Sequence, residues 1–241
     1  MFSLLYEDDD YVIIAKPSGI LVHKTKIAPY DRRFVLQLLR KQLKHWCYPV
    51  HRLDRATSGC LILARSRDKV AAMQAALADE RTTKLYLALV RGEVRPLNTL
   101  EEITKPIQIE KGRFKDARTL AKGICSSPEP RCSLVMAWPK TGRNHQVRRH
   151  LRDVSHPVLM DGQHGDTRIN KVWRREHGLQ RLGLHCLSID VALPDRTISV
   201  TCPVPDDLRD ILVAMPWWEE ALAAVPELAL RLPPPEDTEG A

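Results

Sequence analysis

Residues 51–59 read His-Arg-Leu-Asp-Arg-Ala-Thr-Ser-Gly and carry the strongest signal in this chain of 241 residues. The stretch places one carboxylate, Asp54, among three basic side chains and beside a turn that ends in glycine. Nearby cations keep a carboxylate ionised, which suits a nucleophile. The same residues also fit an ordinary ion pair that holds a loop, so the stretch by itself leaves both interpretations open.

Short strands and amphipathic helices surround this stretch. The turn at residues 54–59 is expected to join two strands, and further strands and helices are predicted from apolar runs and from apolar residues at helical spacing. The expected strands are residues 11–15, 60–64, 85–90, 133–138, 182–187 and 197–201, and the expected helices are residues 33–44, 68–78, 144–152 and 206–215. Residues 95–131 give only weak strand signals. Because strands outnumber helices and most turns are short, we expect an α+β fold with a mixed or antiparallel central sheet and flanking helices.

Charge is distributed unevenly along the chain. Residues 216–241 hold six acids and one base, which leaves 36 basic and 24 acidic side chains, a net charge of +12, on the first 215 residues. A compact domain with this surplus attracts polyanions such as RNA. The acidic, proline-rich end predicts a flexible tail, so the chain is divided into a folded domain of residues 1–218 and a tail of residues 219–241.

Several classes of protein are disfavoured by the sequence. No apolar run approaches the roughly 20 residues that cross a bilayer, and the acidic N-terminus is unlike a secretion signal, so we expect a cytoplasmic protein without membrane contact. The six cysteines form no C-x-x-C pair, and His145 and His150 are five residues apart, so no metal site is expected. Glycine-rich nucleotide-binding loops are absent, and we expect no cofactor.

The stretch at residues 51–59 resembles the H-R-L-D-x-x-T-S-G signature of the RluA-type pseudouridine synthases. Three more segments resemble motifs of this family in the same order: residues 16–23 (KPSGILVH), 84–92 (KLYLALVRG) and 141–150 (TGRNHQVRRH). The resemblance implies that Asp54 is the nucleophile and that Tyr86 lies against the target uracil, where its phenol could assist proton removal from C5. It also implies that Arg143, the first arginine of its motif, pairs with Asp54.

Two later segments are similar to one branch of this family. Residues 164–170 (HGDTRIN) and 177–185 (HGLQRLGLH) resemble the branch called tRNA pseudouridine synthase C, which modifies uridine 65 of certain tRNAs. The resemblance implies a tRNA-binding isomerase, expected to be a monomer, with residues 1–218 as its catalytic domain and no separate S4 RNA-binding domain. The side chains expected to contact RNA are Arg52, Arg55, Arg148, Arg149 and His150.

Pseudouridine formation suits these residues. The reaction breaks the N1–C1′ bond, turns the uracil and joins its C5 to C1′, so nothing is oxidised and no metal or cofactor is required. The target nucleotide must be flipped out of its stack. The aspartate could attack C1′ or C6, or first remove a ribose proton, and the sequence leaves these routes open. The alternatives are a ribosomal-RNA synthase of the same family, a catalytically silent RNA-binding module, and a nuclease or a glycosidase, which typically needs a second carboxylate that no comparable motif supplies.

Overall fold

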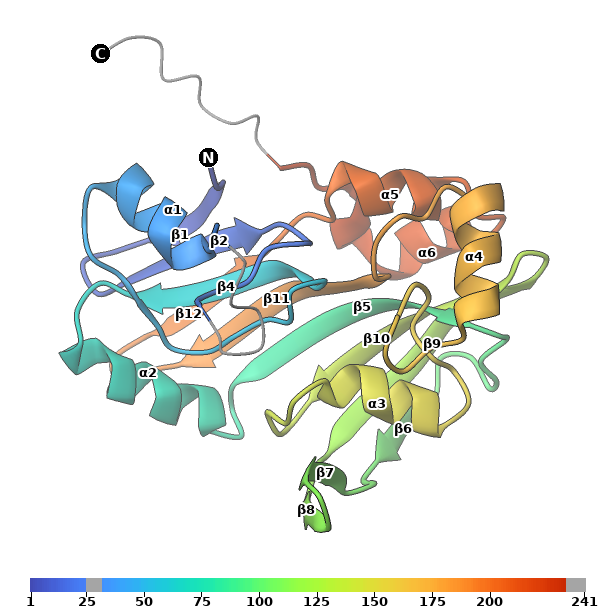
Figure 1. The fold of residues 1–241 in the computed structure, drawn as a ribbon, viewed down its shortest axis with the longest axis horizontal. Helices are drawn as coiled ribbons and strands as arrows, with labels where there is room; N and C mark the ends of the chain where they lie inside the picture. The colour runs from blue at the N-terminus through green and yellow to red at the C-terminus, as the bar shows by residue number, and fades with distance from the viewer. Residues whose placement is uncertain (25–31, 233–241) are drawn as a thin grey trace, which may run out of the picture.

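One large mixed sheet runs through the molecule (Figure 1), and the computed structural model describes residues 1–24 and 32–232. In spatial order its strands are β1 (Leu4–Glu7), β2 (Tyr11–Lys16), β4 (Ser58–Ala64), β11 (Leu184–Ala192), β5 (Thr83–Arg91), β10 (Arg131–Pro139), β9 (Thr119–Pro128) and β6 (Leu100–Ile103), with β3 (Tyr48–Pro49) beside β4 and β12 (Thr197–Thr201) beside β11. The pairing of β4 with β11 is parallel, whereas the other pairs are antiparallel. β7 (Ile107–Glu110) and β8 (Arg113–Lys115) form a separate hairpin that projects beyond the sheet.

Helices cover both faces of the sheet. They are α1 (Val35–Leu43), α2 (Asp68–Ala78), α3 (Gln146–Asp153), α4 (Thr167–Glu176), α5 (Asp206–Val213), α6 (Trp218–Ala224) and the short 3-10 helix η1 (Pro226–Ala229). Alternate residues of β5 reach opposite faces. Leu87 and Leu89 are buried in one cluster with residues of α5 and α6, and Ala88 and Val90 are buried in another with residues of α3. α3 therefore lies on the opposite face from α5 and α6 (Figure 1), and Tyr86, two residues before Ala88, packs on the α3 side.

A glycine fixes the beginning of β4. Gly59 has a φ of +119°, and a Cβ atom at this position would lie 2.2 Å from the carbonyl oxygen of Cys186 on β11. Only glycine tolerates both this backbone conformation and this approach. The glycine that ends the 51–59 stretch thus allows β4 and β11 to pair at the point where the loop carrying Asp54 enters the sheet.

The predicted α+β class with a mixed sheet is confirmed. The weak region 95–131 contains four strands, β6 to β9, and the strand expected at 182–187 begins at Leu184 and continues to Ala192 because its second half pairs with β12. α4 was not predicted, since its sequence is mostly polar and only Asn170 and Trp173 are buried. None of the described helices has the length and apolar character that a membrane span requires.

The boundary expected at residue 218 is too early. α6 and η1 continue the fold, with Ala221, Val225 and Leu228 at most 1% exposed in the same cluster as α5. The acids of this segment, Glu219 and Glu220, lie in the first turn of α6, where negative charge is favourable. The acidic composition therefore concealed an amphipathic helix. The rest of the expected tail, residues 233–241, lies outside the described residues.

Candidate active site

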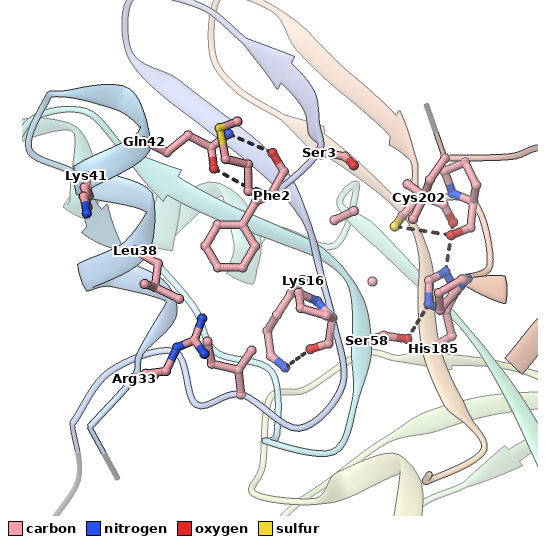
Figure 2. Close-up of a pocket in the computed structure, with 18 residues that line it drawn as sticks. Phe2, Ser3, Lys16, Arg33, Leu38, Lys41, Gln42, Ser58, His185 and Cys202 are labelled. Carbon is pink, nitrogen blue, oxygen red and sulfur yellow. Dashed lines mark hydrogen bonds between the residues drawn. The ribbon is translucent and has the colours of Figure 1, made fainter. Parts of the chain in front are cut away.

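The loop that carries Asp54 is held by the end of β2 and by the residues that follow it. Lys16 is 1% exposed, and its Nζ donates a hydrogen bond to the carbonyl oxygen of Pro17 at 2.8 Å (Figure 2). The same Nζ donates to the carbonyl oxygens of Thr57 at 2.8 Å and of Arg55 at 3.3 Å. Ser18 Oγ donates to the carbonyl oxygen of Ala56 at 2.7 Å. Burial lowers the pKa of Lys16 to about 7. The two motifs at residues 16–23 and 51–59 are thus one structural unit.

A pocket of about 420 Å³ opens beside Asp54. It lies where the loop before β4, the middle of β5 and the start of α3 meet. Five of the residues predicted from the sequence line it, namely Arg52, Asp54, Tyr86, Arg143 and Arg148, together with His145, Thr57 and Lys84. Residues more than 90 positions apart in the sequence are therefore brought to one site.

Arg148 is the arginine that pairs with Asp54. Its Nη1 donates to Asp54 Oδ2 at 2.9 Å, whereas the Nε of Arg143 donates to the carbonyl oxygen of Asp116 at 2.9 Å. The expected pairing of Arg143 with Asp54 is thereby corrected. Arg143 belongs to the turn before α3, while Arg148 lies on the helix face that Val147 and Leu151 bury against the sheet. The spacing of Val147 and Leu151 was the signal in the sequence from which the inward position of Arg148 could have been predicted.

A second carboxylate, not predicted from the sequence, holds the other side of the same guanidinium. Asp161 Oδ2 accepts from Arg148 Nε at 2.7 Å, and Asp161 Oδ1 accepts from Nη2 at 2.8 Å. The Asp161 side chain is 0% exposed. Burial acts to raise the pKa of Asp161, but hydrogen bonds from Arg148 and from the backbone N–H groups of His164 and Gln163 hold that pKa below its ordinary value. Arg148 is therefore fixed in position by Asp161 and directed at Asp54.

His145 lies near the remaining oxygen of Asp54. Its Nε2 lies 3.8 Å from Asp54 Oδ1, and its Nδ1 is hydrogen-bonded to Nε2 of His164 at 2.9 Å. Burial lowers the pKa of His145 below its ordinary value, and the charge of Asp54 opposes this effect. Sequence reasoning considered His145 only as a metal ligand or a phosphate contact. No cluster of three or more potential metal ligands occurs in residues 1–24 and 32–232.

Tyr86 contributes an aromatic ring to the pocket from the centre of the sheet. Burial raises the pKa of its phenol well above the ordinary value, and the neighbouring Cys186 and Asp54 act in the same direction. The phenol therefore keeps its proton at neutral pH. It can donate a hydrogen bond or offer a flat apolar face, but it does not supply a phenolate base.

A comparison with known proteins identifies the family to which this site belongs. The model of the family described as RNA pseudouridylate synthase matches residues 10–153, which include Asp54, Tyr86 and Arg148. The chain belongs to the RNA pseudouridylate synthase family. The family predicted from residues 51–59 is thus confirmed, and with it an isomerase.

Relatives of this synthase cover most of its length. It is 33% identical over 211 residues to tRNA pseudouridine synthase C of Vibrio vulnificus strain CMCP6, covering 80% of this chain and 86% of that protein. It is 33% identical over 239 residues to the protein of the same name from Haemophilus influenzae strain Rd, covering 90% and 99%. The solved structure of human RNA pseudouridylate synthase domain containing 4 has the same fold, with a TM-score of 0.67, 22% identity and coverage of 96% and 95%.

The residues expected to bind RNA are placed very differently in this synthase. His150 is 0% exposed and bonded to Thr119 Oγ1 and to the carbonyl oxygen of Lys105, so its ring holds α3 to neighbouring segments and does not face solvent. Arg148 is likewise buried, in its ion pairs. These two expectations are corrected, because both side chains lie on the inner face of α3. Arg149 donates to the carbonyl oxygen of Gln108.

The two remaining arginines of this group lie at the surface. Arg52 is exposed and lines the pocket, whereas Arg55 is exposed and donates to the carbonyl oxygen of Gly19. Of the five side chains expected to contact RNA, Arg52 is therefore the one that is both exposed and part of the pocket wall.

A second pocket, of about 690 Å³, lies on the far side of Lys16 in the synthase (Figure 2). It is bounded by α1, the start of the chain and residues 202–205, and Leu232, the last described residue, also lines it. Ser58 and His185 form a 2.7 Å hydrogen bond at its edge, and burial lowers the pKa of His185 to about 4. Its described lining contains no carboxylate, so of these two pockets the one around Asp54 is the one that holds a carboxylate.

Proposed function

We propose that the protein isomerises a specific uridine of tRNA, uridine 65, to pseudouridine, with Asp54 as the nucleophile. Relatives that span most of the chain carry the name tRNA pseudouridine synthase C, which supports tRNA as the substrate. One observation carries the catalytic part of the proposal: a carboxylate in a pocket has one oxygen bound by a buried guanidinium and the other close to an imidazole.

The two oxygens of Asp54 have different surroundings. Oδ2 accepts from Arg148, which is itself anchored by Asp161, whereas Oδ1 lies 3.8 Å from His145 Nε2. Oδ1 is the oxygen that reacts. A bond from Oδ1 to C1′ or C6, or removal of a ribose proton by Oδ1, each requires the ionised carboxylate that Arg148 stabilises.

The substrate uridine is everted from its helix before it reacts. Flipping costs a few kcal/mol of stacking and pairing, which contacts in the pocket must offset. Tyr86 supplies a flat face for the uracil, and its protonated phenol supplies a donor. Arg52, exposed at the pocket, is suited to the phosphate or to the space that the uridine leaves in the RNA.

Residues 1–232 act as the catalytic unit, and the enzyme works as a monomer in this proposal. The isomerisation conserves all atoms and involves no redox change, so it proceeds without a cofactor. The net charge of +12 on residues 1–215 supports an RNA partner, because basic surfaces attract the phosphate backbone.

The test uses unmodified tRNA transcripts labelled with tritium at C5 of uridine. The enzyme should release tritium from a transcript with uridine at position 65 and not from the same transcript with cytidine there. Carbodiimide mapping should place the product at that position. Release from ribosomal-RNA fragments but not from tRNA would reject the tRNA assignment, and absence of release from any uridine-containing RNA would reject the catalytic one.

A further inference from the structure

Residues 162–170, which follow Asp161, have no part in the proposed function. They contain the HGD-x-R-x-N sequence and lie directly behind the pocket residues. We propose that His164 is a positioning residue, which holds the His145 ring in one orientation beside the reactive oxygen of Asp54. The inference rests on the proposed function, because it takes Asp54 Oδ1 to be the oxygen that reacts.

The contact between the two histidines is specific. The rings meet edge to face, with 5.1 Å between their centroids and an angle of 73° between their planes, and a 2.9 Å hydrogen bond joins Nδ1 of His145 to Nε2 of His164. Since a neutral imidazole has one N–H group, one of these two nitrogens donates and the other accepts, so the tautomer of His164 sets which nitrogen of His145 carries the proton. His164 therefore controls whether a donor or an acceptor faces Asp54 Oδ1.

His145 needs such a partner because its backbone does not fix its ring. It lies immediately before α3 with a φ of 54°, in the left-handed region, and its side chain is 18% exposed. The ring is therefore outside the helix, where packing within the helix does not restrain it. His145 Nδ1 is hydrogen-bonded to His164, whereas His145 Nε2 makes the 3.8 Å approach to Asp54.

His164 itself is held rigidly. Its backbone N–H donates to Asp161 Oδ1 at 2.9 Å, and Asn170 Nδ2 donates to the carbonyl oxygen of Asp161 at 3.0 Å. A Cβ atom at Gly165 would lie 2.5 Å from that same carbonyl oxygen, so the turn requires glycine there. Asp166 caps α4 through the backbone N–H of Arg168 at 2.9 Å. Each specified residue of the HGD-x-R-x-N sequence, apart from the Arg168 side chain, thus helps to fix this turn.

Asp161 connects the two sides of the site. Its carboxylate binds the Arg148 guanidinium directly, and through the backbone of His164 it also fixes the group that holds His145. Arg148 and His145, which lie next to the two oxygens of Asp54, are therefore both held in place by the buried carboxylate of Asp161. Pre-organisation of this kind suits a site in which a displacement of about 1 Å costs a large factor in rate.

Burial keeps the two rings neutral at ordinary pH, among charges of both signs. His145 faces Asp54, Arg148, Asp161 and Arg52, and His164 faces Asp161, Arg148, His145 and Arg152. Burial is the largest influence on both, and it lowers both pKa values below the ordinary 6.5. In acid a protonated His145 carries N–H on both nitrogens and pairs with Asp54 Oδ1, so the reactive oxygen becomes occupied.

Three variants of the full chain test the inference. His164→Ala removes the bond to His145, and His164→Gln places an amide nitrogen or oxygen near the position of Nε2. His156→Ala is the matched control, since His156 is a half-buried histidine eight positions before His164 whose Nδ1 contacts the carbonyl oxygen of Arg91. Single-turnover tritium release, RNA affinity and the imidazole ¹⁵N NMR spectrum of His145 are measured for each.

We expect His164→Ala to react about 10- to 100-fold more slowly with unchanged RNA affinity, while His164→Gln and His156→Ala stay within about threefold of the wild type. The spectrum of His145 should show one tautomer in the wild type and in His164→Gln, and a mixture in His164→Ala. An unchanged tautomer in His164→Ala overturns the inference whether or not RNA is modified, so its failure is separate from failure of the proposed function. Loss of RNA affinity with an unchanged rate also overturns it.

Discussion

Replacing Arg148 with methionine removes the guanidinium that lies between the carboxylates of Asp54 and Asp161. Arg148 donates to Asp54 at 2.9 Å and to Asp161 at 2.7 and 2.8 Å. The side chains of Arg148 and Asp161 are 7% and 0% exposed. Methionine has a similar length but no donor, so Arg148→Met leaves Asp161 buried without a counter-ion.

The loss of stability and the loss of rate in Arg148→Met can be estimated from these contacts. Removal of one partner of a buried ion pair destabilises a protein by about 3–5 kcal/mol, because the other charge is left uncompensated. Asp161 keeps two backbone donors, from Gln163 and His164, so the free energy of unfolding should fall by the smaller amount, about 3 kcal/mol. A hydrogen bond to a charged group contributes about 1.5–3 kcal/mol, so the single-turnover rate should fall about 10- to 100-fold.

Arg143→Met is the matched control, in the same motif and the same pocket. The Arg143 Nε donates to a backbone carbonyl, so its loss should change the free energy of unfolding by no more than about 1 kcal/mol. Urea unfolding followed by tryptophan fluorescence measures the stability of both variants, and tritium release measures their rates. If Arg148→Met unfolds within about 1 kcal/mol of the wild type, or if Arg143→Met is the more damaging change, the reasoning is refuted.

Three further outcomes are expected. Asp54→Asn should abolish tritium release while RNA affinity in a filter-binding assay persists, and residual release at the wild-type rate would exclude Asp54 as nucleophile. Gly59→Ala should lower the free energy of unfolding by at least about 3 kcal/mol, because its Cβ would lie 2.2 Å from the carbonyl oxygen of Cys186 and its φ is positive. A urea midpoint equal to that of the wild type would contradict this prediction. Because the pKa of Asp161 is lowered in the folded state, its contribution to stability is present above the unfolded pKa and is lost as pH falls through the folded value. Asp161→Asn should therefore flatten the acid side of the curve of unfolding free energy against pH, and a curve parallel to that of the wild type would count against the assignment.

The central motifs could be predicted from sequence because they act locally. The 51–59 stretch combines a turn, a glycine required by a positive φ and a carboxylate among bases, and each of these is visible in the residue order. Strands and helices with clear apolar periodicity were likewise predictable. Such features depend on near neighbours in the chain, which a single sequence displays.

The partners of Asp54 could not be predicted in the same way. Choosing Arg148 over Arg143 depends on which face of α3 meets the sheet, and the role of Asp161 depends on a turn 13 residues further on. α6 was missed for a related reason, since its acids lie on the exposed side of a helix whose other side is buried. In each case long-range packing, which composition does not display, decides the role of a charged residue.

The parallel pairing of β4 with β11 has a mechanical consequence. Only two aligned pairs, Ser58 with His185 and Gly59 with Cys186, connect these strands, and β11 joins the part of the sheet built by the first 64 residues to the part that begins with β5. Asp54 belongs to the first part, while Arg148 and Tyr86 belong to the second. The ion pair between Asp54 and Arg148 therefore spans a junction of two aligned pairs, and any twisting of one half of the sheet against the other changes the separation of the Asp54 carboxylate from the Tyr86 ring.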